Sequence, residues 1–181
     1  TAIVLQNALV GLGCFLLAEL ILLPRFVGGS AATPVWPASG LAVAAVWLLG
    51  PRVLPGIFVA LAFVIGVRAP LPLALIGPLG PITETLLAVR LLRLLRFDDR
   101  LERLRDPLAL SLVAAPISAA AAATIGTLAA WTFGALTTPD LAWGWLLWLM
   151  RDWLGVAMFV PLVFAWLRSR RVPDSSLHIV E

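Results

Sequence analysis

Long, nearly uninterrupted apolar runs constrain the fold of this chain more than any other feature. Six such runs follow one another, separated by short breaks rich in Pro, Gly, Arg and other polar residues. A helix that crosses the hydrocarbon core of a bilayer needs about 20 predominantly apolar residues. The 181 residues are 61% hydrophobic and 13% charged, whereas soluble domains are about 45–50% apolar and about 25% charged. The sequence therefore predicts an all-α, polytopic membrane helix bundle and excludes a water-soluble or disordered chain.

The runs predict about six transmembrane helices, although two of them are short. The runs cover residues 2–23, 36–50, 53–67, 71–95, 108–136 and 141–167. The second and third span only about 22 Å as helices. They could form two short tilted spans, a re-entrant hairpin or one long kinked span. Two spans are favoured because Gly50-Pro51-Arg52 is a strong helix break.

The fourth and fifth runs carry local signals of their own. The first half of the fourth run contains prolines and glycines, ending at Gly80-Pro81, and is predicted to be broken before a cleaner helix from Ile82. In the fifth run small residues recur at every fourth position, namely Ser118, Ala122, Gly126 and Ala130. Such a stripe lets another helix backbone approach closely, so this face is predicted to be packed.

Arginine clusters predict the orientation of the bundle. Residues 90–105 contain six Arg and residues 168–171 contain three. Cytoplasmic segments are enriched in basic residues, and two runs separate these clusters, so both are expected in the cytoplasm together with both termini. Three acidic residues, Asp98, Asp99 and Glu102, interleave with the Arg stripe from 90 to 105, and Asp106 follows it. The stripe is interpreted as a snorkelling helix end that passes into a salt-bridged segment. Residues 1–171 would form the membrane domain, and 172–181 a polar tail or linker that follows it.

Several kinds of function find no support in the composition. The single cysteine, Cys14, excludes an internal disulfide, and the single histidine, His178, excludes a bis-His haem or a His-rich metal site. Neither a catalytic Ser-His or Cys-His arrangement nor a phosphate-cradling loop is present. The net charge of +3 is concentrated at the ends of the runs, which does not indicate nucleic-acid binding. We expect no enzyme activity, catalytic residue, cofactor or metal.

Two motifs resemble those of the MASE1 domain, a bacterial integral-membrane sensory domain. Residues 36–42, WPASGLA, lead to residues 50–58, GPRVLPGIF, in the manner of its opening motif. A Gly-rich stretch leading to Glu84, and residues 148–155, WLMRDWLG, agree with later landmarks, so the resemblance covers about residues 3–168. The chain departs from the family pattern at Ala38, where a second Pro is usual, and at Pro78 or Pro81, where an Asn is usual. The family's domain is also commonly longer.

The resemblance implies a multi-pass sensor of the bacterial inner membrane. Such a domain would bind a small ligand in an outward-facing pocket and relay a helix shift to a cytoplasmic output domain, a histidine kinase or a diguanylate cyclase, as in two-component signal transduction. The ligand, the output partner and self-association as a homodimer stay open. Two alternatives remain: a small membrane substrate-binding or transport subunit, and a structural subunit of a larger membrane complex.

Charged residues inside the runs are the candidates for the functional site. A charge in the membrane interior costs about 2.5–3.5 kcal/mol on insertion scales, and Glu19, Glu84, Arg151 and Asp152 all lie within apolar runs. The predicted topology places Glu84 and Arg151 at similar depth, so we expect them to form an ion pair with Asp152 as a competing partner. This pair could equally hold two helices together without any ligand, and a proton or ion pathway is a third reading. Glu19 could be only a snorkelling carboxylate near the interface.

The remaining candidates are aromatic or lie in the first motif. Trp36 and Pro37 could form an interfacial anchor and a helix start, or, as the resemblance implies, the mouth of a pocket. Trp148 and Trp153 flank the charged pair. The candidate polar cluster comprises Glu19, Trp36, Pro37, Ser39, Gly40, Glu84, Trp148, Arg151 and Asp152.

Overall fold

Every regular element of the described chain is a helix. The computed structural model of the protein describes residues 1–22 and 35–169. Its helices are α1 (Ala2–Leu22), α2 (Pro37–Leu49), α3 (Leu54–Gly66), α4 (Leu71–Ile76), α5 (Leu79–Leu94), α6 (Arg105–Ala109), α7 (Ala115–Thr132) and α8 (Leu141–Ser169). Short 3-10 turns precede α3 and α8, and a π-helical turn, Leu110–Ala114, joins α6 to α7. The all-α prediction is confirmed. The predicted tail, 172–181, and the polar loop at 26–34 lie outside the described residues.

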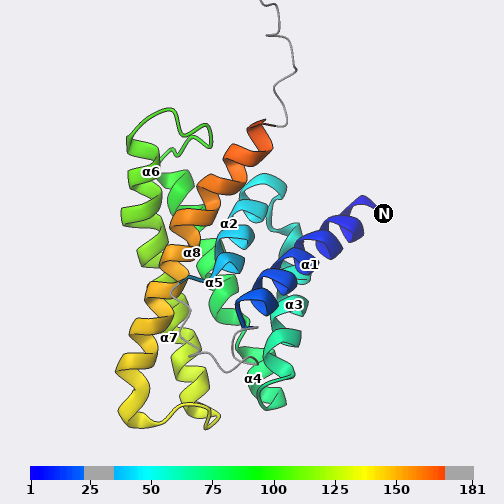
Figure 1. The fold of residues 1–181 in the computed structure, drawn as a ribbon, viewed down its shortest axis with the longest axis vertical. Helices are drawn as coiled ribbons and strands as arrows, with labels where there is room; N and C mark the ends of the chain where they lie inside the picture. Colours follow the sequence, from blue (N-terminus) through cyan, green and yellow to red (C-terminus); the bar gives the residue numbers. More distant parts are fainter. Residues whose placement is uncertain (23–34, 170–181) are drawn as a thin grey trace, which may run out of the picture.

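Four helices of the described chain are long and apolar enough to cross a membrane. These are Ala2–Leu22, Leu71–Leu94, Arg105–Thr132 and Thr138–Ser169. The helices α2 and α3 have 13 residues each, which corresponds to about 20 Å. Figure 1 shows α2 running towards the end of the bundle that carries the 95–104 loop, and α3 running back. The single kinked span is therefore wrong: the chain reverses at residues 50–53, where Gly50 has a φ of 82° and a 3-10 turn follows.

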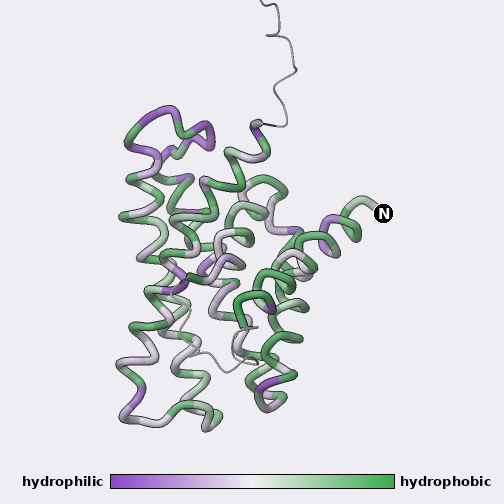
Figure 2. Tube along the Cα trace, in the orientation of Figure 1, coloured by the Kyte–Doolittle hydropathy of each residue, from purple (hydrophilic) through white to green (hydrophobic). Residues whose placement is uncertain are grey.

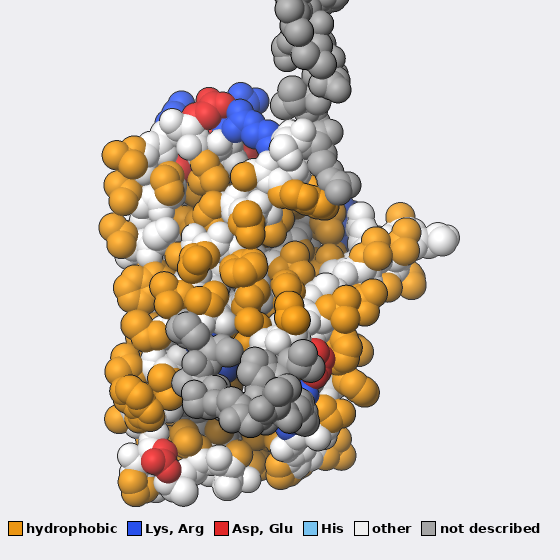
Figure 3. All heavy atoms as spheres, viewed as in Figure 1, with side chains coloured by type: hydrophobic (Ala, Val, Ile, Leu, Met, Phe, Trp, Pro, Cys, Tyr) orange, Lys and Arg blue, Asp and Glu red, His pale blue; other side chains and the backbone are white. Residues whose placement is uncertain are grey.

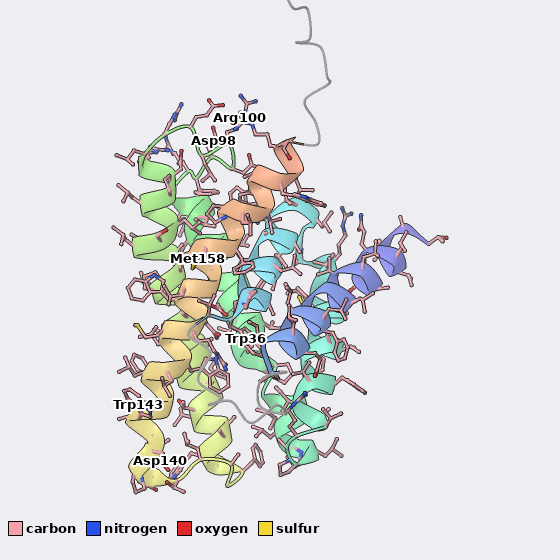
Figure 4. All side chains as sticks on the ribbon, viewed as in Figure 1. Trp36, Asp98, Arg100, Asp140, Trp143 and Met158 are labelled. Atoms are coloured by element: carbon pink, nitrogen blue, oxygen red, sulfur yellow. The ribbon has the colours of Figure 1, made fainter. Side chains whose placement is uncertain are left out.

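The short helix α2 occupies the centre of the bundle. Nine of its 13 residues are buried, and it packs against α1, α5 and α8. Its start lies within the bundle: in Figure 4, Trp36 is between Asp98 and Arg100 at one end and Asp140 and Trp143 at the other. A helix end inside a membrane protein must find partners within the protein. Here the backbone N–H of Trp36 donates to the Arg151 carbonyl of α8 at 3.0 Å.

Two glycines let α2 and α8 cross with their backbones in contact. A Cβ atom added to Gly155 of α8 would overlap the Trp36 carbonyl oxygen, and one added to Gly40 of α2 would overlap the Gly155 carbonyl. No larger residue fits either position without moving one helix. The crossing therefore fixes the start of α2 beside the middle of α8.

The predicted break and the predicted packed face are both present. Gly77 and Pro78 separate α4 from α5, as the prolines and glycines of the fourth run indicate. On α7, Ser118, Ala122 and Gly126 are buried. A Cβ atom on Gly126 would overlap the Trp148 ring of α8, and one on Gly80 of α5 would lie 3.1 Å from the Ala122 carbonyl. The small-residue stripe thus packs against both α5 and α8.

The outer surface matches a bilayer environment. Figure 3 shows hydrophobic side chains over most of the visible face, with a charged group at the end that carries the 95–104 loop. On α1 the buried residues are Gly11, Cys14 and Ala18 alone, and leucines such as Leu9 and Leu20 are exposed. An exposed apolar surface of this extent favours lipid contact.

Candidate functional site

A polar cluster is buried where α2, α5 and α8 meet. Figure 2 shows hydrophilic segments halfway along the bundle as well as at its ends. Glu84 of α5 is 0% exposed, Asp152 of α8 1%, and Ser39 of α2 3%. Ionisable groups at this depth are costly, and they are retained where they pair or function. The cluster therefore contains the candidate functional groups of the described chain.

Glu84 is held by the first turn of α2. The Ser39 hydroxyl donates to Glu84 Oε2 at 2.9 Å. The positive end of the α2 dipole also lies on this side, and it favours a nearby carboxylate. The second oxygen, Oε1, is buried and has no hydrogen-bond partner among the described residues. Glu84 therefore has one acceptor oxygen satisfied and one unused.

Arg151 lies between two indole rings. Its guanidinium carbon is 4.4 Å from the centre of the Trp36 ring and 5.7 Å from that of Trp148. Arginine stacks favourably on aromatic faces, more so where water is excluded. The Arg151 side chain is 29% exposed. The Arg151 guanidinium therefore contacts Trp36, which precedes α2, and Trp148, which lies one turn earlier on α8.

Asp152 is satisfied on one side only. Trp148 Nε1 donates to its Oδ2 at 2.8 Å. Arg151 Nε lies 3.7 Å from its Oδ1, and within the described chain both atoms are buried without a hydrogen bond. The two groups thus form an ion pair with unused hydrogen-bonding capacity.

The expected ion pair between Glu84 and Arg151 is not formed. Within residues 1–22 and 35–169, Glu84 accepts from Ser39 and the carboxylate partner of Arg151 is Asp152. The reason is that α2 packs against both α5 and α8. Its first turn reaches Glu84, and the preceding Trp36 stacks on Arg151. The similar depth predicted for Glu84 and Arg151 correctly placed both side chains in one region of the bundle. It could not reveal that α2 contacts both of them.

A cavity of about 200 Å³ adjoins the cluster. Its wall includes Trp36, Trp148, Arg151 and Asp152, together with Arg68 from the end of α3 and apolar residues such as Leu61. Trp36 is 8% exposed and lies between the two ends of the bundle (Figure 4), which favours a place in the cavity wall over an interfacial anchor. Burial follows from its position between α2 and the Arg151 guanidinium.

Glu19 belongs to a neighbouring ion pair. Its two carboxylate oxygens accept from the Arg68 guanidinium at 2.9 and 2.6 Å, which ties α1 to the end of α3. Sequence reasoning did not select Arg68, although it is the single Arg between the third and fourth runs. Pro37 starts α2 and Gly40 forms the helix crossing. The other six selected residues meet at the cluster or its cavity wall.

Trp153 links α8, the helix that carries Arg151 and Asp152, to the π-helical turn. Its Nε1 donates to the Ser111 carbonyl at 2.7 Å. Ser111 lies inside the π-helical turn, and such turns occur frequently at functional sites. The sequence gives no signal for this partner, because the acceptor is a backbone group. Among the described residues, no group of three or more His, Cys, Asp or Glu could hold a metal ion.

The fold and the buried cluster define a helical membrane domain with a polar centre. The MASE1 family model matches residues 6–181, nearly the whole chain, and the chain therefore belongs to the MASE1 family of membrane-associated sensory domains. The comparisons with curated proteins and with solved structures found no match.

Proposed function

We propose that this domain senses a small ligand at the polar cluster and relays its binding to a cytoplasmic output partner through α8. In this proposal the chain crosses the bacterial inner membrane six times, with both termini in the cytoplasm. The Arg-rich segments at residues 90–105 and 168–171 support this orientation. The cavity would then be reached from the outer side.

The observation that carries the proposal is a set of unused polar atoms beside a cavity. Arg151 Nε and Asp152 Oδ1 belong to residues of the cavity wall and are buried without partners among the described residues. Glu84 Oε1, in the same cluster but not in the cavity wall, is also buried without a partner there. Leaving such a group unpaired costs about 1–3 kcal/mol, and more for charged groups. The adjoining cavity of about 200 Å³ is smaller than the roughly 300–1,000 Å³ of pockets for drug-sized ligands. A ligand of a few heavy atoms with polar groups would satisfy what the protein leaves open.

The central helix provides a route from the cluster to the far end of the bundle. Trp36 and Ser39 contact the cluster at the start of α2. At its other end, Trp47 packs edge-on against Phe97 at 5.4 Å, and its Nε1 reaches Asp99 Oδ2 at 3.4 Å. Both partners belong to the 95–104 loop. A short helix held at both ends transmits displacement rather than absorbing it.

The same loop holds the end of α8. Arg168 donates to the Arg100 carbonyl at 2.7 Å and to Glu102 Oε1 at 2.6 Å, and Phe164 lies 6.2 Å from Phe97. A ligand that moves Trp36 would therefore act on α8 both directly, through Arg151, and indirectly, through α2 and the loop. The output partner would be a histidine kinase or a diguanylate cyclase, the domains that follow MASE1 domains.

A thermal-shift screen tests the ligand site. The purified domain would be melted in detergent with single amino acids, dicarboxylates and sugar phosphates as probes. A compound that binds at the cluster should raise the Tm of the native domain and of Trp143→Ala, which removes an exposed tryptophan far from the cluster. It should not raise the Tm of Trp36→Ala. A compound that stabilises Trp36→Ala as much as the native protein would place its site elsewhere, and a panel without any stabilising compound would count against these ligand classes.

A further inference from the structure

The Arg-rich end of the bundle contains an open pocket separate from the polar cluster. It measures about 540 Å³ and is lined by Arg96, Arg103 and Arg105, by Asp98 and Asp99, and by the aromatic residues Trp47 and Phe97. Figure 3 shows basic and acidic side chains gathered at this end. With three arginines and two aspartates, the lining carries one excess positive charge.

Each acidic residue of this end has a partner, and Glu102 and Asp106 form salt bridges, as expected of a salt-bridged segment. Asp98 Oδ1 accepts from the Arg100 backbone N–H, and Asp99 accepts from Trp47. Glu102 pairs with Arg168. The remaining acid, Asp106, is buried beside Arg105.

Two of the three arginines of the pocket, Arg96 and Arg103, are available to an anion. In the described part of the chain, neither Arg96 nor Arg103 has a carboxylate within ion-pair distance; the salt bridges formed there involve Arg68, Arg105, Arg151 and Arg168. Arg105 is oriented by a hydrogen bond from its Nη2 to the Arg96 carbonyl at 2.9 Å. Exposed guanidinium groups arranged in this way suit the oxygens of a phosphate group.

Neighbouring leucines indicate that the anion belongs to a lipid. Leu104 stands between Arg103 and Arg105 in the chain and is 77% exposed, the highest value among the exposed large hydrophobic residues; Leu94, at the end of α5, is 69% exposed. A leucine between two arginines can contact acyl chains while the basic groups reach the headgroup layer. Basic pockets between membrane helices bind anionic headgroups by this chemistry.

We propose that this pocket binds the phosphodiester group of an anionic membrane phospholipid through Arg96, Arg103 and Arg105. A phosphodiester carries a single negative charge, and Arg96 and Arg103 are the two arginines of the lining that have no carboxylate partner among the described residues. The bound lipid would sit on the 95–104 loop, which contacts both Trp47 of α2 and Arg168 of α8. The proposal requires this end to lie at a membrane–water boundary, and it does not require the ligand site at the polar cluster.

Lipid titration of the purified domain tests the proposal. The domain in neutral-lipid nanodiscs would be titrated with phosphatidylglycerol, with bound lipid counted by native mass spectrometry. The double variant Arg96→Gln/Arg103→Gln should bind about thirtyfold more weakly than the native domain, because each basic group near an anionic surface contributes roughly a factor of five. The matched control is Arg90→Gln/Arg93→Gln, which removes the same charge outside the pocket lining and should bind nearly as the native domain does.

Two further experiments distinguish a lipid from free phosphate, and a single variant replaces the double variant if that protein does not fold. Leu104→Gln should weaken phosphatidylglycerol binding, and inorganic phosphate at the same concentration should not displace the lipid. Equal losses in the two double variants, or displacement by inorganic phosphate, would overturn the lipid site. If the Arg96→Gln/Arg103→Gln protein does not fold, Arg103→Gln alone should still show about a fivefold loss, and unchanged binding by that variant would reject the proposal.

Discussion

At the scale of single residues, the stack of Trp36 on Arg151 joins two parts of the candidate site. The indole covers the guanidinium at 4.4 Å while the Trp36 backbone N–H binds the Arg151 carbonyl. One residue therefore positions both the charge and the start of α2. A planar, delocalised cation is needed here, because an ammonium group is more strongly hydrated and does not stack in the same way.

Replacing Arg151 by lysine should destabilise the domain although the charge is kept. The expected loss is about 1–2 kcal/mol in the free energy of unfolding, from the lost stacking between two indoles. Denaturant unfolding in detergent measures it, with Arg93→Lys, an exposed arginine at the end of α5, as control. Equal stability of the Arg151→Lys and native proteins would show that the stacking contributes nothing.

The hydrogen bond between Ser39 and Glu84 should appear as coupling in a double-mutant cycle. Ser39→Ala leaves a buried carboxyl group without its donor and should cost about 1–3 kcal/mol. In a Glu84→Leu background, where no acceptor remains, the same change should cost much less. Additive losses would contradict the pairing. Ser118→Ala is the control, because that buried hydroxyl donates to the Ala114 and Ala115 carbonyls of the preceding turn.

At the scale of elements, the half-length helix α2 explains how far the sequence could predict the site. Apolar runs locate the helices, and Gly77-Pro78 marks the break between α4 and α5. Depth arithmetic, however, assumes that each run starts at a membrane face. This assumption is wrong for α2, which starts inside the bundle (Figure 4). The partners of Glu84 and Arg151 depend on how α2 packs against α5 and α8, and the sequence alone could not predict that packing.

The crossing of α2 and α8 should tolerate no added methyl group. Gly155→Ala would force its Cβ against the Trp36 carbonyl, and overpacking of this kind costs about 1–3 kcal/mol. Gly144→Ala on the same helix is the control: its Cβ would meet only the flexible Leu136 side chain, at 3.1 Å. That change should be neutral or stabilising, because alanine favours helix more than glycine does. A Gly155→Ala protein that melts like the Gly144→Ala protein would contradict the tight crossing.

At the scale of the whole molecule, the two ends of the bundle differ in charge. The end with the 95–104 loop carries most of the basic residues, whereas the opposite end carries Asp140 (Figures 3 and 4). Arg100 and Asp140 are both exposed. This asymmetry was visible in the sequence, since it depends on composition at run ends and not on packing.

Cysteine labelling should show which end of the bundle faces the cytoplasm. A membrane-impermeant maleimide applied to intact cells should modify Asp140→Cys and spare Arg100→Cys, with the reverse pattern in inside-out vesicles. The native Cys14 is buried and should stay unlabelled, so the native protein is the blank. Modification of Arg100→Cys in intact cells would invert the proposed topology.

The π-helical turn between α6 and α7 lets one long helix keep two registers. Asp106 and Ser118 are both fully buried, yet their separation of twelve positions would turn them about 120° apart on a continuous α-helix. The wider turn at Leu110–Ala114 absorbs part of that angle, as a single-residue insertion into a regular helix would. Deleting one residue there would restore the hydrogen-bond ladder and leave the two buried positions eleven positions apart, which is about 20° on a regular helix. Both would then stay on the buried face, so this segment should tolerate the loss of that one residue, whereas the loss of a second would turn one of the two positions away from the core.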